Sequence, residues 1–89
     1  MIISIPLIYV RETKDNSMRV TKTQAVLYLL QLFLKNGVVK KEDFLATIQV
    51  SEVSFRRYIN ELRCYFVNFD LYDEIIYDPS DGAYHLKTP

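Results

Sequence analysis

Apolar residues recur at helical spacing between residues 21 and 36. Four of them are spaced three, one and three positions apart, namely Val26, Leu29, Leu30 and Phe33. Thr21 and Gln24 have the spacing of a capping box, and Asn36-Gly37 is typical of a helix end. The pattern predicts a helix over residues 21–36. Because Leu27, Leu32 and Leu34 widen the apolar face, we expect a core helix covered on several sides, with an N-terminal strand or a second subunit as further cover.

A second apolar stripe predicts a long helix over residues 51–69. Its members follow at spacings of four, three, four and three: Phe55, Ile59, Leu62, Phe66 and Phe69. Ser51 is a good N-cap. Val50 before this cap and Phe55 at the fourth helical position form the pattern of a hydrophobic staple.

Three shorter elements complete the pattern. Residues 41–48 predict a helix whose core face comprises Phe44, Leu45 and Ile48. Residues 74–87 predict a hairpin, with Pro79-Ser80-Asp81-Gly82 as its turn. Residues 1–12 alternate as in an N-terminal strand or arm, with Pro6 marking a sheet edge.

This order of elements predicts one α+β domain over residues 1–89, mainly helical with a small β-sheet. Two helices joined by a very tight turn and followed by a hairpin describe a winged helix-turn-helix. The expected fold therefore has three helices, a C-terminal hairpin wing and an extra N-terminal strand.

Composition excludes several classes of function. The 89 residues include one cysteine, Cys64, and one histidine, His85, so an intramolecular disulfide is impossible and we expect no metal site and no cofactor. We expect Cys64 to be inert and His85 to be a strand surface residue. The chain lacks a catalytic constellation or a glycine-rich phosphate loop, which argues against an enzyme. The apolar start is too short to span a bilayer and has no export motif, so we expect a cytoplasmic protein.

Charge is distributed unevenly along the chain. Residues 1–66 carry ten Lys and Arg against six Asp and Glu, whereas residues 67–89 carry one against five. An anionic partner is therefore expected to bind the first two-thirds of the chain.

The segment VSEVSFRRYINEL, residues 50–62, resembles the recognition helix of DeoR-type bacterial repressors, whose pattern is approximately V-S-x-x-T-I-R-R-D-L-N-x-L. The following residues match in identity or kind: Val50, Ser51, Ser54, Phe55, Arg56, Arg57, Ile59, Asn60 and Leu62. The hairpin EIIYDPSDGAYHL similarly resembles the wing of this group and of the helix-turn-helix domains that precede WYL domains. Tyr58 and Gln49 depart from the family's aspartate and glycine. DeoR-type regulators also carry a sugar-phosphate-sensing domain, which residues 1–89 do not include, so the resemblance does not lead us to expect ligand sensing.

The resemblance and the helical wheel together predict a DNA-binding surface. Helix 51–69 is expected to enter the major groove of double-stranded DNA through its exposed N-terminal residues, which are Ser51, Glu52, Val53, Ser54, Arg56, Arg57 and Asn60. Three further cations are expected to contact phosphates: Lys40, Lys41 and Arg63. The alternative is that the arginines are solvated surface charges, with Arg57 partly paired to Glu61.

We therefore expect a small bacterial or phage transcriptional regulator that binds DNA as a homodimer. The acidic wing does not fit this expectation well, because Asp78 and Asp81 would repel phosphate. The alternative function is a protein-interaction module on the same scaffold, such as a phage-type inhibitor of a host protein, which would use the acidic wing.

Overall fold

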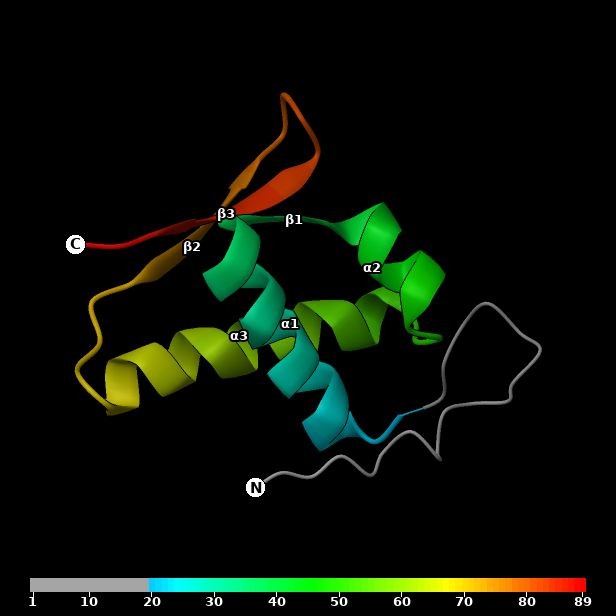
Figure 1. Ribbon diagram of the computed structural model, residues 1–89, viewed down its shortest axis with the longest axis horizontal. Coiled ribbons are helices and arrows are strands. Elements are labelled where there is room, and N and C mark those ends of the chain that lie inside the picture. Colours follow the sequence, from blue (N-terminus) through cyan, green and yellow to red (C-terminus); the bar gives the residue numbers. More distant parts are fainter. Residues whose placement is uncertain (1–19) are drawn as a thin grey trace, which may run out of the picture.

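The computed structural model describes residues 20–89 and has an α+β fold (Figure 1). Its elements, in chain order, are α1 (Lys22–Asn36), β1 (Val38–Lys40), α2 (Lys41–Thr47), α3 (Glu52–Asn68), β2 (Glu74–Asp78) and β3 (Ala83–Lys87). Helix α1 crosses α3 and ends beside the sheet, while α2 lies near the N-terminal end of α3 (Figure 1). The predicted strand over residues 1–12 lies outside the described residues. The three helices within residues 20–89 are too short or too polar to span a bilayer.

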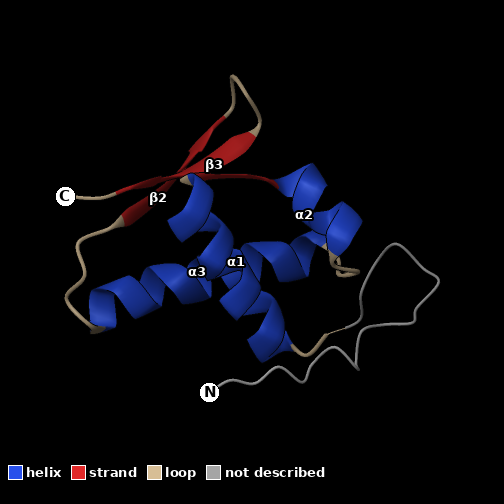
Figure 2. Ribbon diagram, in the orientation of Figure 1, coloured by secondary structure: helices blue, strands red, loops and turns tan. Residues whose placement is uncertain are grey.

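The sheet has three antiparallel strands in the order β1-β3-β2 (Figure 2). The hairpin of β2 and β3 confirms the predicted one, and Tyr77 lies opposite Tyr84 in its register. Strand β1 was not predicted. It pairs Val38 with His85 and Val39 with Tyr84, so the third strand of the described sheet comes from the link between α1 and α2.

The helix ends follow the predicted capping chemistry. The Thr21 hydroxyl accepts a hydrogen bond from the Gln24 amide at 3.1 Å, and the Gln24 side chain accepts one from the Thr21 amide at 3.2 Å. Gly37 ends α1 in the left-handed region with a φ of 78°, where L side chains are disfavoured. At the start of α3, the Ser51 hydroxyl accepts from the Ser54 amide at 3.0 Å.

Helix α3 ends in a Schellman motif. The amide of Leu71 donates to the Phe66 carbonyl, and the amide of Asp70 donates to the Val67 carbonyl. Asp70 occupies the left-handed position with a φ of 56°, which glycine usually fills. The chain therefore turns sharply after Asn68 and leads back towards β2.

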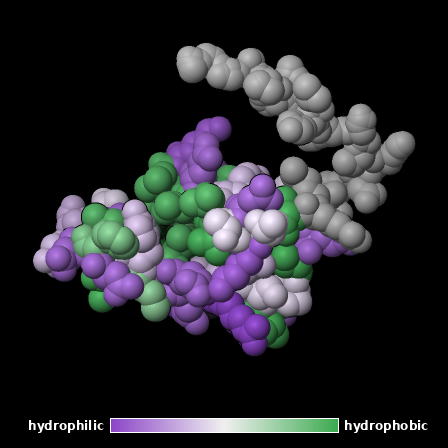
Figure 3. Space-filling model, turned by 90° about the horizontal axis from the view of Figure 1, so that it is seen from below, coloured by the Kyte–Doolittle hydropathy of each residue, from purple (hydrophilic) through white to green (hydrophobic). Residues whose placement is uncertain are grey.

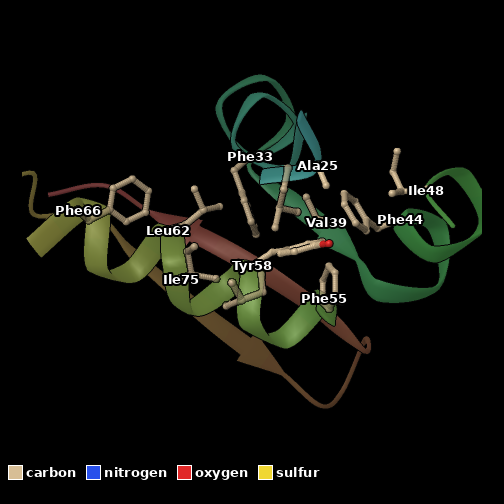
Figure 4. Packing of buried hydrophobic residues seen from close by; sticks show 12 residues of the cluster. Ala25, Phe33, Val39, Phe44, Ile48, Phe55, Tyr58, Leu62, Phe66 and Ile75 are labelled. Carbon is tan, nitrogen blue, oxygen red and sulfur yellow. The ribbon is translucent and has the colours of Figure 1, made fainter. Parts of the chain in front are cut away.

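Aromatic and aliphatic side chains from all three helices and from β1 and β2 form one core (Figure 4). Phe55 packs its ring 5.2 Å from that of Phe44 and 5.4 Å from that of Tyr84. The predicted positions that are buried are Leu29, Phe33, Phe44, Ile48, Phe55, Ile59, Leu62 and Phe66. Val26, Leu30, Leu45 and Val50 are partly buried against them.

Several predictions about the core are wrong. Phe69 was expected to extend the stripe of α3 but is 66% exposed, because the helix ends one residue earlier. Leu27 and Leu34 of α1 are also exposed among the described residues, whereas the small Ala25 is fully buried. Tyr58 was not predicted to be buried, yet its ring lies in the middle of the cluster (Figure 4).

Candidate nucleic-acid interface

The outward face of α3 presents Arg56, Arg57 and Asn60 to solvent. This follows from the helical step of 100° per residue, because Phe55, Ile59 and the later core residues point inward. The side chain of Arg56 is 62% exposed. Neither arginine is buried in the fold, so both arginines that we predicted to contact DNA are accessible within the described part of the chain.

Glu52 lies between two cations at the N-terminal end of α3. Its carboxylate accepts a hydrogen bond from the Lys41 ammonium and lies 3.9 Å from the Arg56 guanidinium. The hydrogen bond from Lys41 lowers the pKa of Glu52 below its ordinary value, and the same bond raises the pKa of Lys41. Lys41, which we predicted to contact phosphate, thus has an internal anionic partner that a phosphate would have to displace.

Arg57 has no ion pair among residues 20–89. The predicted partial pairing of Glu61 with Arg57 is wrong, since the Glu61 carboxylate instead lies 3.3 Å from the Lys22 ammonium. Arg57 borders a shallow hollow that is also lined by Lys22, Asn60, Glu61 and Cys64. Its guanidinium is therefore available to an external anion without first breaking a contact to a described carboxylate.

Arg63 ties α3 to the sheet. Its guanidinium donates to the Ile75 carbonyl at 2.8 Å and to the side-chain oxygen of Asn60 at 3.2 Å. Two of its donors are thus used within the fold, which sequence patterns did not indicate. Asn60 accepts this bond through its amide oxygen and keeps its amide nitrogen as a donor.

The other predicted contacts occupy the start of α3 and the strand before α2. Ser51 and Ser54 are joined by hydrogen bonds at the helix start, where the amide groups and the dipole favour an anion. Val53 is exposed beside them. Lys40 is the exposed last residue of β1, and it has no ion pair among the described residues.

A groove between α3 and the hairpin was not predicted. Its lining combines cations, an amide and aromatic rings, namely Arg56, Ile59, Asn60, Arg63, Tyr77 and Tyr84. The two tyrosine rings lie 4.9 Å apart, and Tyr77 is about half exposed. Alternation along residues 75–77 and 84–86 is a signal that could have placed both tyrosines on one face of the hairpin. It does not indicate that this face lies beside α3.

The acidic groups of the hairpin turn are bonded to the turn itself. Asp78 accepts from the amide and hydroxyl of Ser80, and the hydroxyl bond in particular lowers the pKa of Asp78. Asp81 accepts from the Ala83 amide at 3.0 Å and lies 2.8 Å from Nε2 of His85. Ligand-type atoms of Asp78, Asp81 and His85 lie within 4.8 Å of one another, but these hydrogen bonds account for the arrangement.

No protein family, curated protein or solved structure matches this chain. What the site can bind is therefore inferred from its residues and their geometry. Two exposed guanidinium groups, an amide donor, a capped helix start and a neighbouring aromatic groove suit an extended anionic partner that also offers hydrogen-bond acceptors.

Proposed function

We propose that the chain binds double-stranded DNA as a winged helix-turn-helix, with α3 in the major groove. In this proposal α2 and α3 are the helix-turn-helix, and the β2–β3 hairpin is the wing. The resemblance of residues 50–62 to the DeoR-type recognition helix points the same way. A role as a small transcriptional regulator follows if the binding is sequence-specific.

The observation that carries the proposal is the exposure of Arg56 and Arg57 on the outward face of α3. Surface arginines in general are solvated, but these two follow a tight interhelical turn and a capped helix start. Forked guanidinium groups match guanine O6 and N7 or a phosphate, and the free amide nitrogen of Asn60 is a donor for a base edge. In this geometry Tyr77 faces the DNA backbone from the groove beside Arg56.

The proposal is tested with a fluorescent duplex of random sequence, titrated at several salt concentrations from about 50 mM upwards. We expect micromolar binding at low salt that weakens steeply as salt rises, because phosphate contacts release counterions. Arg57→Ala is expected to weaken binding about tenfold and to reduce the salt slope by about one. Selection from a randomised duplex pool then shows whether the binding is sequence-specific.

Lys35→Ala is the matched control. Lys35 is an exposed cation in the last turn of α1, so this variant loses the same charge at a site outside the proposed surface. Equal losses of DNA affinity in the two variants would indicate a general charge effect and would contradict the assignment of the DNA contact to α3. Absence of duplex binding at low salt would contradict the proposed function itself.

A further inference from the structure

The C-terminal end of α3 carries an exposed apolar surface, which we call the α3-end patch. It comprises residues that are 39–75% exposed, namely Tyr65, Val67, Phe69, Leu71 and Tyr72. Figure 3 shows apolar residues interspersed with hydrophilic ones at the end of the molecule where α3 terminates, and a larger apolar area next to this end. Five such residues within eight positions exceed the scattered apolar residues of an ordinary surface.

The patch is held in a defined shape. The Schellman motif at Asp70 fixes the path of residues 66–71, and the rings of Tyr65 and Phe69 lie 5.2 Å apart. Tyr65 also borders an apolar groove between α1 and α3, lined by Val26, Leu27, Leu30, Glu61, Leu62 and Tyr65. A partner can therefore insert one apolar side chain into the groove and cover the patch with others.

The charge around the patch selects the kind of partner. Asp70 lies within its span and Asp73 follows it, and no Lys or Arg occurs between Arg63 and Lys87. Arg63 is bonded to the Ile75 carbonyl, and Lys87 lies opposite Glu74 across the hairpin. The last turn of α3 has no basic residue, and within residues 20–89 neither carboxylate has an ion pair, so both lie near the negative end of the helix dipole.

We propose that the α3-end patch docks a cationic amphipathic segment of a partner protein. Such a segment covers the apolar side chains and brings Lys or Arg to Asp70, Asp73 and the last carbonyls of α3. A second copy of this chain fits less well, because a two-fold contact would bring the same acidic groups face to face. This surface lies at the end of α3 opposite to Arg56 and Arg57, and it differs from the hairpin turn, whose acids bond within the turn.

The probe is a helical peptide of about 18 residues with leucine at helical spacing and lysine elsewhere, titrated into the full chain and followed by amide NMR shifts. We expect shifts confined to α3 from Leu62 onward, to the 69–74 loop and to the groove face of α1. A peptide with glutamate in place of lysine is expected not to bind. Equal binding of both peptides, shifts centred elsewhere, or no binding would overturn the proposal.

Two pairs of variants localise the interaction. Phe69→Ser is expected to weaken peptide binding at least about tenfold, while Val53→Ser, an exposed apolar change at the other end of α3, leaves it unchanged. The double variant Asp70→Asn with Asp73→Asn is expected to weaken binding about fivefold at low salt. Its control, Glu42→Gln with Asp43→Asn, removes two exposed acids of α2. Asparagine tolerates the left-handed position of Asp70, so the variant keeps its helix end.

A second copy of the chain or its own N-terminal segment on the α3-end patch would give different results in sedimentation and NMR. If sedimentation shows a dimer that Phe69→Ser converts to a monomer, a second copy covers the patch and the proposal fails. It also fails if Phe69→Ser shifts the amides of residues 1–19, which would assign the patch to this chain's own N-terminal segment. None of these outcomes depends on DNA binding, because no nucleic acid is present in the experiment.

Discussion

At the scale of single residues, Tyr58 gives a physical reason for a departure from the DeoR-type pattern. The pattern has an aspartate after its arginine pair, but here the position is 7% exposed and surrounded by the core. A carboxylate would be desolvated there, and the buried side chains of residues 20–89 include no charged group that could neutralise it. The neighbouring Arg57 points outward, so it does not neutralise such a group.

We predict that Tyr58→Asp unfolds the domain or costs at least about 3 kcal/mol in the free energy of unfolding. Tyr58→Phe is expected to cost less than about 1 kcal/mol, because the ring fills the same space. Urea unfolding followed by circular dichroism measures both values. Near-native stability of the aspartate variant would contradict the placement of Tyr58 in the core.

Glu52 is the residue whose charge most directly opposes the proposed DNA contact, since it holds Lys41 and lies near Arg56. We predict that Glu52→Gln strengthens binding to a random duplex about two- to fivefold at low salt, because it removes a negative charge and frees Lys41. Glu61→Gln, which removes the partner of Lys22, is the charge-matched comparison. Weaker binding in the Glu52 variant would show that the carboxylate itself contributes to recognition.

The Lys41–Glu52 pair also has a pH signature. The lowered pKa of Glu52 means that its stabilising effect is complete above the ordinary pKa of glutamate and is lost as pH falls through the lowered value. The pKa of Lys41 is raised, so the stabilising effect of its charge is complete at low and neutral pH. This effect is lost as pH rises through the raised value. Glu52→Gln should therefore melt slightly below the wild type at neutral pH and converge with it in strong acid, as measured by thermal melts.

At the scale of elements, local patterns predicted the helices and the hairpin because their causes are local. The capping box at Thr21, the N-cap at Ser51 and the turn at residues 79–82 each depend on neighbours a few positions away. Strand β1 was missed because it is three residues long and exists only by pairing with distant β3. The exposure of Phe69 was missed because periodicity does not mark where a helix ends.

The contact between α3 and β2 gives a prediction at this scale. We expect Arg63→Ala to lower the free energy of unfolding by about 1–2 kcal/mol, because the part-buried Ile75 carbonyl loses a charged donor at 2.8 Å. Arg57→Ala, one of the exposed arginines, is expected to change it by less than about 0.5 kcal/mol. Chemical unfolding measures the free energy of unfolding of both variants. Similar losses in the two variants would contradict the structural role of Arg63.

At the scale of the whole molecule, the helical wheel identified the exposed side chains of the candidate site but not their partners. Arg56, Arg57 and Asn60 face outward as expected. The contacts of Lys41 with Glu52, Lys22 with Glu61 and Arg63 with Ile75 join residues of different elements, which no local pattern reveals. The aromatic groove beside α3 depends in the same way on how the hairpin packs.

Homodimerisation stays a prediction at this scale. The exposed Leu27 and Leu34 give α1 an apolar side among the described residues, and a dimer would place two copies of α3 against half-sites about one DNA turn apart. Sedimentation at increasing protein concentration measures the state of the free chain. A monomer at all concentrations that also binds an isolated half-site as tightly as a paired one would contradict this prediction.

Amide NMR of the full chain with a duplex at low salt shows whether DNA contacts the outward face of α3. We predict the largest shifts at residues 51–60, with smaller ones at Lys40, Lys41 and Tyr77, and none at the α3-end patch. Shifts centred on the α3-end patch or on α1, with residues 51–60 unchanged, would contradict DNA contact at this face.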